Sequence, residues 1–346
     1  MALGFGIVGC GMIADFHARA LASLPNAKVV GCASRSPQSA RAFAKKHNCR
    51  FLATVEDLTG DPEVDVVSIC SPSGAHLEPA LLAARAGKHV VVEKPLEVTP
   101  ARCDQIIEAC EDSGVLLSTI FQSRFHESSR LLKSAVEAGR FGQIALANAY
   151  VKWHRSQEYY DSGAWRGTWE LDGGGALMNQ AIHNVDLLLW MMGPVEEVTA
   201  YTATLAHLRI EVEDAAVAIL RFANGALGTI EATTSAFPGE SKRLEIYGSS
   251  GSAAIVDEEI QNWHFAESLP DDQTIIDRLA AQNATDGGAS DPASIGFAAH
   301  ASQFQNVIDA IEGRDQLLVD GGEARKSVEL IDAIYKSARE RKPVKL

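Results

Sequence analysis

The residues Gly9-Cys10-Gly11-Met12-Ile13-Ala14 follow the apolar run Leu3–Val8 near the start of the chain. They form a G-x-G-x-x-A pattern between a strand pattern and a helix pattern. The first glycine permits a tight turn, the second lets a pyrophosphate approach the backbone, and the alanine lets the helix pack closely on the strand. The helix N-terminus then attracts the phosphate charge. Glycine-rich turns are common, but in this context the pattern predicts a dinucleotide-binding site.

Short apolar runs alternate with helical patterns from this turn up to about residue 120. Continuous rather than alternating hydrophobicity is typical of parallel strands that are buried on both faces. The alternation predicts an α/β fold with a Rossmann domain over residues 1–122. The expected strands are Leu3–Val8, Val29–Ala33, Val64–Cys70, Val90–Glu93 and Val115–Ile120, and the expected helices are Ile13–Leu24, Ala40–Lys46, Leu77–Ala86 and Ala101–Asp112.

The pattern changes after residue 140 and predicts a second, α+β domain over residues 123–346, with an open, mainly antiparallel sheet. The polar, weakly patterned stretch 271–291 is expected to form a surface loop. Two final amphipathic helices, at about 299–312 and 323–339, can also pack back on the first domain. The expected strands are Ile144–Val151, Ala215–Phe222, Ala226–Ser235, Arg243–Tyr247 and Ala253–Val256.

The composition favours a protein that acts on small molecules. A chain of 346 residues is long enough for two domains, and its net charge of −14 opposes binding to nucleic acid or to an anionic membrane. No apolar segment approaches the roughly 20 residues of a membrane span, and no basic signal-peptide start is present, so a cytoplasmic location is expected. The six cysteines have no metal-type spacing and are expected to be reduced core thiols.

A second motif, Glu93-Lys94-Pro95, ends an apolar run. Ligands of open α/β sheets bind at the carboxyl ends of the strands, so this motif brings a lysine to the predicted nucleotide site. Lys94 is therefore a candidate functional residue, and a solvated surface lysine is the alternative.

Three polar residues, Asn179, His183 and Asp186, stand at i, i+4 and i+7 beside the apolar stretch 187–192. This spacing places them on one face of a helix. His183 is a candidate acid/base or substrate-orienting residue, with a buried structural histidine as the alternative. Asp186 is a candidate substrate contact, or a residue that orients the histidine.

The chain resembles the glucose–fructose oxidoreductase, inositol dehydrogenase and rhizopine catabolism family, often written Gfo/Idh/MocA. The resemblance rests on the N-terminal turn, Glu93-Lys94-Pro95, the glycines 173–175, the 179–186 pattern and the segment 320–326. It implies hydride transfer between a nicotinamide and a sugar or cyclitol carbon, with Lys94 and His183 as catalytic residues. Many members have aspartate where this chain has Asn179, which puts inositol dehydrogenase activity in doubt because an amide cannot relay a proton.

Cofactor preference depends on the end of the second strand, where an acidic residue would bind the adenosine ribose. Ser34 and Arg35 stand there instead, so NADP is favoured over NAD, unless Arg35 is merely solvated. The loop 71–76 resembles the family loop that contacts the nicotinamide half, with an ordinary turn as the alternative. The expected cofactor-binding residues are Gly9, Gly11, Met12, Ile13, Ser34, Arg35, Ser71, Pro72, His76, Glu93, Lys94 and Gln122.

The segment 152–169 mixes aromatic residues with cations and amides, a composition that suits a carbohydrate. A structural aromatic cluster is the alternative. A free sugar, a sugar acid and a nucleotide sugar all stay open as substrates, and the histidine spacing indicates no metal site. The expected substrate-binding residues are Asn179, Asp186, Trp165, Arg166, Tyr160 and Lys152.

Two classes of function remain at this point. An NAD(P)-dependent oxidoreductase is favoured over a non-catalytic dinucleotide sensor of the same fold, because a sensor needs neither Lys94 nor His183. The outward face of 229–235 carries small and hydroxylated residues, which suits packing against another subunit. A homodimer or homotetramer is therefore expected, as the resemblance also implies.

Overall fold

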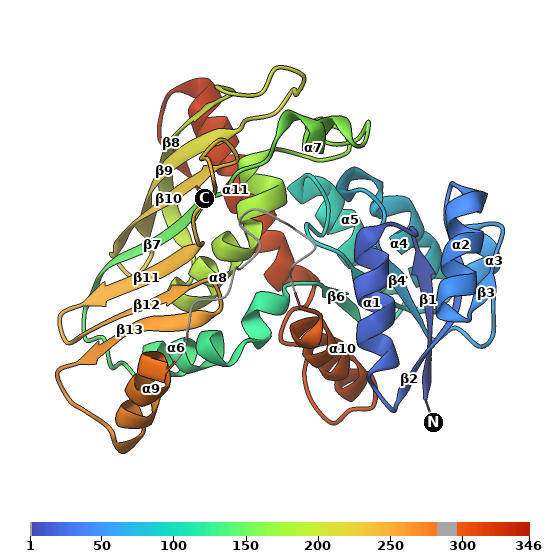
Figure 1. Cartoon of the computed structure of the whole chain (residues 1–346), viewed down its shortest axis with the longest axis horizontal. Helices are drawn as coiled ribbons and strands as arrows, with labels where there is room; N and C mark the ends of the chain where they lie inside the picture. Colours follow the sequence, from blue (N-terminus) through green and yellow to red (C-terminus); the bar gives the residue numbers. More distant parts are fainter. Residues whose placement is uncertain (1, 282–295) are drawn as a thin grey trace. The chain divides into compact units, whose positions relative to one another are not determined.

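A computed structural model of the chain describes residues 2–281 and 296–346 (Figure 1). The chain divides into two compact units. Unit 1 comprises residues 1–122, 170–173 and 296–328, and unit 2 comprises residues 123–169, 174–295 and 329–346. Each unit is built around one sheet.

The sheet of unit 1 has six parallel strands in the order β3-β2-β1-β4-β5-β6. This is the order of dinucleotide-binding folds, in which ligands bind where the strand order reverses, between β1 and β4. The predicted α/β fold is confirmed, and each strand predicted in this part of the chain is present. The strands are β1 (Leu3–Val8), β2 (Ala27–Ala33), β3 (Arg50–Phe51), β4 (Val66–Ile69), β5 (His89–Val92) and β6 (Leu117–Thr119).

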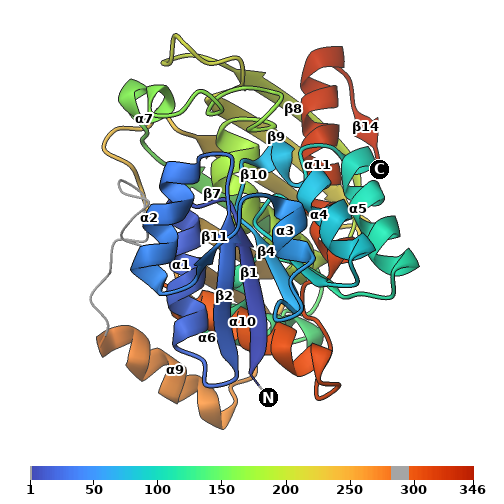
Figure 2. The ribbon, with the colours of Figure 1, turned by 90° about the vertical axis from the view of Figure 1, so that its right-hand side faces the viewer.

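Helices cover both faces of this sheet. Figure 2 shows α1 and α2 on one side of the strands and α4 and α5 on the other. The short helix α3 was not predicted, because its single turn is too brief to show a periodic pattern. The helices are α1 (Met12–Ala22), α2 (Pro37–His47), α3 (Val55–Thr59), α4 (Leu77–Arg85) and α5 (Pro100–Asp112), with a 3₁₀ turn η1 (Ser73–Ala75) after β4.

A late segment of the chain completes the core of unit 1. Helix α10 (Ala298–Ile311) contacts α1, and Phe304 meets Phe5 edge-on with ring centroids 5.7 Å apart. Val307 and Ile308 belong to the same buried cluster. The second late helix, α11 (Gly321–Glu340), has its first residues in unit 1 and its last in unit 2.

Unit 2 contains a mixed sheet of eight strands in the order β13-β12-β11-β7-β10-β9-β8-β14. Most neighbours are antiparallel, but β7 and β10 are parallel, with Leu146 opposite Leu227. The predicted mainly antiparallel sheet is confirmed, and β7 with β10 is a parallel pair within it. The helices α7 (Gln157–Asp161) and α8 (Ile182–Met192) and the strands β8 and β9 intervene in sequence between the two, which leaves room for a crossover. The strands are β7 (Ile144–Lys152), β8 (Val195–Ala203), β9 (Ala215–Phe222), β10 (Leu227–Thr233), β11 (Arg243–Gly248), β12 (Gly251–Val256), β13 (Glu259–Phe265) and β14 (Val344–Lys345).

The two faces of this sheet differ. Helix α8 (Ile182–Met192) is almost entirely buried and packs on one face, against β7 and β11 (Figure 1). The other face exposes apolar side chains, among them Tyr201 at 76%, Val217 at 51% and Ile219 at 59%. Exposed and buried residues alternate along β9, as expected for a strand with only one covered face.

The predicted surface loop at 271–291 is wrong in its first part, because α9 (Pro270–Ala281) is a helix. Asp272 in its first turn accepts hydrogen bonds from the Arg140 guanidinium, the Trp263 indole and the Leu269 backbone N–H. These tertiary contacts fix a helix that the polar sequence did not indicate. The rest of the predicted loop lies outside the described residues.

Three further findings concern the whole of the described chain. The six cysteines form no disulfide in this structure; Cys32, Cys70, Cys103 and Cys110 are buried, whereas Cys10 and Cys49 are partly exposed and so are not the core thiols that were predicted. Among residues 2–281 and 296–346, we find no helix whose length and hydropathy would let it cross a membrane. Helices α6 (Glu127–Glu137) and α7 (Gln157–Asp161) were not predicted.

Candidate active site

The glycine-rich turn has the geometry that its pattern predicts. Gly9 has a φ of +88°, and a Cβ there would lie 2.7 Å from the Cys70 carbonyl, so only glycine fits between β1 and the end of β4. A Cβ on Gly11 would meet nothing within 4 Å. Helix α1 begins at Met12, and its N-cap is Gly11. Because glycine has no side chain, Gly11 cannot cap the first backbone N–H groups of the helix. Open space and backbone N–H groups at this position fit a pyrophosphate.

The end of β2 carries the two residues expected to select the cofactor. Ser34 is partly buried and follows the last residue of the strand, and Arg35 is exposed. Ser36 begins helix α2, where its hydroxyl accepts the Ser39 N–H at 3.2 Å. The Ser34 hydroxyl accepts the Ser36 N–H at 3.5 Å and can still donate to a ligand, and the exposed Arg35 side chain can reach one as well.

His76 joins two loops at the carboxyl edge of the sheet. Its Nε2 lies 2.9 Å from the Ser71 carbonyl and its Nδ1 lies 3.0 Å from the Pro95 carbonyl. The ring is 1% exposed, and burial lowers the pKa of its imidazole. His76 therefore connects the loop after β4 to the turn that contains Lys94.

Gln122 follows β6 and is buried, and its Oε1 has no hydrogen-bond partner within the described residues. A buried amide oxygen without a partner is uncommon in a folded protein, and a donor group of a bound ligand would satisfy it. Together with the open glycine turn, this atom fits a dinucleotide along the carboxyl edge of the sheet. When bound, such a cofactor supplies a nicotinamide ring that accepts or donates a hydride.

Glu93 and Lys94 follow β5 directly. Glu93 is buried, and its carboxylate accepts hydrogen bonds from Nε2 of His17 at 2.7 Å and from the Lys94 backbone N–H at 3.0 Å. Lys94 is partly exposed at this edge. Each oxygen of Glu93 accepts a hydrogen bond from a protein donor, and the prediction that Glu93 binds the cofactor stays a prediction.

The glycines 173–175 precede η3 (Ala176–Ala181), a π-helical turn of unit 2. A Cβ on Gly174 would lie 2.1 Å from the Tyr335 hydroxyl, and one on Gly175 would lie 1.8 Å from the Glu213 carbonyl oxygen. The buried Glu213 carboxylate accepts the N–H groups of Gly175 at 3.0 Å and Leu177 at 2.8 Å. The glycines thus permit the close packing that anchors the start of η3.

The predicted single α-helix through 179–186 is wrong at its start. Asn179 lies in η3, and the α-helix begins at Ile182, so the i, i+4, i+7 spacing does not describe one regular face. A π turn has more residues per turn than an α-helix and often occurs at functional sites. Asn179 and His183 are both partly exposed within an otherwise buried segment.

Asp186 is fully buried and has a different environment. Its two carboxylate oxygens accept bonds from Nε and Nη2 of Arg124, at 2.8 and 2.7 Å. Both side chains are almost inaccessible to solvent. The carboxylate therefore holds Arg124 in this structure, and its role as a direct substrate contact stays a prediction.

A connected group of polar side chains surrounds Asn179, and we call it the Gln180 cluster: Arg155, Tyr159, Arg166, Asn179 and Gln180. The Gln180 amide donates to Asn179 Oδ1 at 2.7 Å and to the Tyr159 hydroxyl at 3.1 Å, and its oxygen accepts Arg155 Nη2 at 3.0 Å. Arg166 Nη1 donates to the same hydroxyl at 2.6 Å. The structure thus brings Arg166 and Asn179, two predicted substrate residues, into one network.

The other predicted substrate residues differ in their placement. The Tyr160 hydroxyl forms a hydrogen bond with the Thr234 hydroxyl, and the Tyr160 ring packs on His207. These contacts are the ones expected if Tyr160 belongs to a structural aromatic cluster. Trp165 is partly exposed, with the Arg166 guanidinium 4.5 Å from its ring centroid. Lys152 pairs with Glu231 on the sheet at 2.7 Å and does not join the Gln180 cluster.

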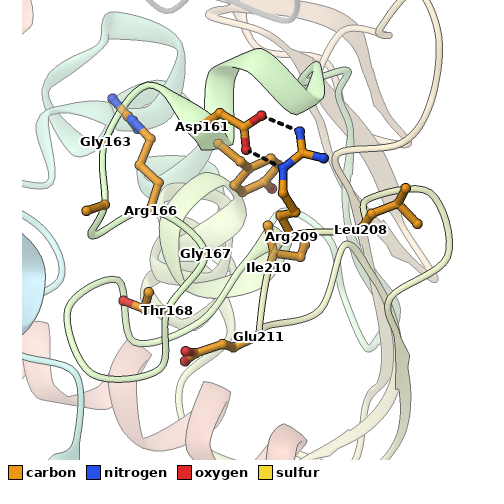
Figure 3. Close-up of a pocket in the computed structure, with 11 residues that line it drawn as sticks. Asp161, Gly163, Arg166, Gly167, Thr168, Leu208, Arg209, Ile210 and Glu211 are labelled. Atoms are coloured by element: carbon orange, nitrogen blue, oxygen red, sulfur yellow. Dashed lines mark hydrogen bonds and ion pairs between the residues drawn. The ribbon is translucent and has the colours of Figure 1, made fainter.

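A pocket of about 330 Å³ adjoins this region of unit 2. Figure 3 shows Asp161 paired with Arg209 at one side and Glu211 at another. Asn179 and His183 do not line it, so it is not the centre of the predicted chemistry. Its lining residues are Tyr160, Asp161, Gly163, Ala164, Arg166, Gly167, Thr168, Leu208, Arg209, Ile210 and Glu211.

Sequence reasoning missed several partners of the site residues. Glu213, Arg124 and Gln180 lack a motif, and each joins its partners through tertiary contacts. Histidine spacing indicated no ligand pattern, yet within the described residues the ligand atoms of His17, Glu93 and His300 lie within 4.8 Å of one another. A polar residue inside an apolar run, such as His17 in the first helix, is the one signal that could have pointed to this group.

Comparison with known proteins establishes the family. A model described as "Oxidoreductase family, NAD-binding Rossmann fold" matches residues 3–121, and one for the GFO/IDH/MocA C-terminal domain matches residues 129–254. Myo-inositol 2-dehydrogenase of Thermotoga maritima is 32% identical over 251 residues, which are 71% of this chain and 73% of that protein. The chain belongs to the Gfo/Idh/MocA family. The resemblance predicted from the motifs is confirmed.

Solved structures agree over the full length. The WlbA dehydrogenase from Bordetella pertussis, in complex with NADH and UDP-GlcNAcA, is 37% identical with a TM-score of 0.92, covering 100% of this chain and 98% of that chain. Levoglucosan dehydrogenase with NADH and levoglucosan is 25% identical with a TM-score of 0.87, covering 100% and 99%. The protein is an NAD(P)-dependent dehydrogenase that acts on CH–OH groups, in a family of sugar and cyclitol dehydrogenases.

Proposed function

We propose that the enzyme transfers a hydride between a nicotinamide dinucleotide and a secondary hydroxyl carbon of a UDP-linked sugar acid. The Gln180 cluster carries the proposal, because its two guanidinium groups and two amides suit the carboxylate and hydroxyls of such a sugar. Similarity to the WlbA dehydrogenase over the whole chain supports the same substrate class. Free sugars and cyclitols are the competing substrates, as the inositol and levoglucosan dehydrogenases indicate.

In this proposal, Lys94 and His183 handle the proton. The hydride leaves the carbinol carbon with its electron pair, so the hydroxyl proton must pass to a base while the oxygen becomes a carbonyl. Asn179 cannot accept a proton and instead binds a substrate hydroxyl. Asp186 acts through its pair with Arg124, which fixes the helix that carries His183.

The substrate assignment is tested by a screen read through absorbance of the reduced nicotinamide. We expect turnover with UDP-GlcNAcA, weaker turnover with the same sugar nucleotide lacking the carboxylate, and none with glucose, levoglucosan or myo-inositol. Arg166→Ala should raise the KM for the acid much more than that for the neutral analogue. Faster oxidation of myo-inositol than of any sugar nucleotide would contradict the assignment.

For the cofactor, we propose a preference for NADP over NAD through Ser34 and the exposed Arg35. No carboxylate stands at the end of β2 to repel a 2′-phosphate, and a guanidinium can bind one. Titration calorimetry with both oxidised cofactors measures the preference, and Arg35→Ala should weaken NADP binding alone. Equal or tighter NAD binding, unchanged in the variant, would refute it.

We also propose that the enzyme is a homodimer or homotetramer assembled by two-fold symmetry on the open sheet of unit 2. The exposed apolar residues Tyr201, Val217 and Ile219 support this assignment. An apolar face of this kind is more typical of an interface than of a surface exposed to water.

A further inference from the structure

Two consecutive residues of unit 2, Glu213 and Asp214, carry buried carboxyl groups, and the residues are 4% and 0% exposed. They directly precede strand β9, and each carboxyl group accepts several hydrogen bonds. Most of the donors lie in two separate segments of the chain, 175–177 and 205–207. The chemistry proposed above gives neither carboxyl group a role.

Glu213 holds the start of η3. Its carboxyl group accepts the backbone N–H groups of Gly175 at 3.0 Å and Leu177 at 2.8 Å, and its own carbonyl accepts the Ala176 N–H at 3.0 Å. The Tyr335 hydroxyl donates to the same carboxyl group at 3.0 Å. The first N–H groups of a helical turn have no partner within the turn, so these bonds fix the place where η3 begins.

This anchor reaches Asn179 through one further bond. The Gly175 carbonyl accepts the Asn179 backbone N–H at 3.0 Å. Gly175 is therefore bonded to Glu213 through its N–H and to Asn179 through its carbonyl. The position of the Asn179 amide in the Gln180 cluster thus depends on the Glu213 carboxyl group.

Asp214 holds a different segment. Its carboxylate accepts the backbone N–H groups of Leu205 and Ala206 at 2.8 Å and that of His207 at 3.0 Å. Nδ1 of His207 lies 2.9 Å from the same carboxylate, and Nε2 lies 2.8 Å from the Arg155 carbonyl oxygen. Both partners of the ring are acceptors, so both bonds form when each ring nitrogen carries a proton. The imidazole then joins Asp214 to the backbone of Arg155.

The two anchors converge on Gln180. Its side-chain oxygen accepts Arg155 Nη2 at 3.0 Å, and its amide nitrogen donates to Asn179 Oδ1 at 2.7 Å. Glu213 is bonded to the segment that carries Asn179. Asp214 is bonded, through the imidazole described above, to the segment that carries Arg155. Because 213 and 214 are neighbours in the chain, the peptide bond between them fixes the two anchors relative to each other.

The two carboxyl groups differ in their protonation. Burial raises the pKa of the Glu213 carboxyl group to about 7. Burial also raises the pKa of the Asp214 carboxyl group, but hydrogen bonds from backbone N–H groups and from His207 outweigh burial and hold this pKa below its ordinary value. The ionised Asp214 therefore makes charge-assisted bonds at neutral pH. Because Glu213 titrates near neutral pH, all variants below are compared at a single pH.

We propose that Glu213 and Asp214 are positioning residues for substrate binding. Glu213 places the Asn179 amide. Asp214 places Arg155. The inference rests on the proposed function, in which the Gln180 cluster binds the carboxylate and hydroxyls of the sugar. Both carboxyl groups are buried and act through other residues, so their loss should weaken substrate binding and leave the chemical step and the cofactor site of unit 1 intact.

The test is steady-state kinetics of the full-length enzyme. Glu213→Gln and Asp214→Asn each replace an acceptor oxygen with an NH₂ group, which cannot accept a backbone N–H. We expect each variant to raise the KM for the sugar substrate roughly tenfold, with kcat within about threefold of the wild type and an unchanged cofactor Kd. A variant that merely folds less well would lower the amount of active enzyme, and so kcat, rather than raise KM.

The matched control is Asp272→Asn. This carboxylate is also buried in unit 2 and accepts hydrogen bonds from Arg140, Trp263 and Leu269, none of which belongs to the Gln180 cluster. The control should lose stability and keep the wild-type KM.

Double variants separate positioning from a general loosening of unit 2. In an Asn179→Ala background, Glu213→Gln should raise KM no further, because it acts through Asn179. Asp214→Asn should keep its effect in the same background, because it acts through Arg155.

Two milder variants serve if the carboxyl variants fail to fold. Tyr335→Phe keeps the ring and removes the hydroxyl donor to Glu213. His207→Phe keeps an aromatic ring against Tyr160 and removes the bonds to Asp214 and to the Arg155 carbonyl. Each should raise KM with little change in kcat, and only the effect of Tyr335→Phe should vanish in the Asn179→Ala background.

Wild-type KM values in the folded variants would overturn the proposal, and so would a KM increase from Glu213→Gln that persists in full in the Asn179→Ala background. The substrate screen makes the two hypotheses fail separately. If the enzyme oxidises a different sugar, only the proposed function fails, and the KM for that sugar tests the positioning roles. If it oxidises UDP-GlcNAcA with the same KM in wild type and variants, only this inference fails.

Discussion

In the proposed function, Lys94 and His183 act at the reacting hydroxyl rather than on the adenosine or pyrophosphate. Alanine at either position is therefore expected to lower kcat by about 10²–10⁴-fold while the cofactor Kd changes little. Stopped-flow turnover and cofactor titration on the same preparations measure both quantities. Lys88→Ala is the matched control, since Lys88 precedes β5, at the opposite end of that strand from Lys94, and donates to the Asp61 carbonyl. Near-normal kcat in Lys94→Ala would require another residue at the reacting hydroxyl.

A variant at Asp186 can show whether this residue has a structural or a catalytic role. Asp186→Ala leaves the buried Arg124 guanidinium without its carboxylate, which should lower the free energy of unfolding by roughly 3–5 kcal/mol. Urea denaturation measures this loss, and Asp161→Ala, which removes an exposed pair with Arg209, should cost far less. If Asp186→Ala unfolds like the wild type yet loses turnover, Asp186 is a direct substrate contact.

Local spacing found some of these residues and could not find others. Asn179, His183 and Asp186 stand within eight positions of one another, where helical periodicity applies. Arg124 lies 62 residues from Asp186, and His17 lies 76 residues from Glu93. Such pairs form only when the sheet and helices are assembled, so no spacing rule in the sequence indicates them.

Whole elements were predicted best where burial gives a continuous apolar run. The strands of unit 1 are buried on both faces, and their runs located β1, β2, β4, β5 and β6. Helix α9 was missed because its anchor is the contact of Asp272 with Arg140 and Trp263, outside its own sequence. The π turn η3 was read as α-helix, since the Glu213 carboxylate and the Tyr335 hydroxyl that shape its start come from distant segments.

Glu213 makes the anchoring of η3 depend on pH. Burial raises the pKa of its carboxyl group from 4.5 to about 7. The folded state thus holds a proton that the unfolded chain releases, and stability is expected to be fully present below about pH 4.5 and to fall as the pH rises through about 7. Urea unfolding at several pH values should show this decline in the wild type and a smaller one in Glu213→Gln. Identical pH dependence in the two proteins would contradict the assignment to Glu213.

For the whole molecule, the open sheet of unit 2 leads to a prediction about assembly. Tyr201 is paired with Val217 across β8 and β9, and Ile219 is paired with Thr229 across β9 and β10, so the exposed apolar residues form a continuous area. Charged residues placed there would be buried without partners in a two-fold interface.

We expect the wild type to be a dimer or tetramer by light scattering, and the double variant Val217→Glu/Ile219→Glu to be a monomer that still binds the cofactor. Leu269→Glu, at an exposed position before α9, is the control and should keep the wild-type mass. A monomeric wild type at micromolar concentration would leave this apolar face as a surface for a different partner.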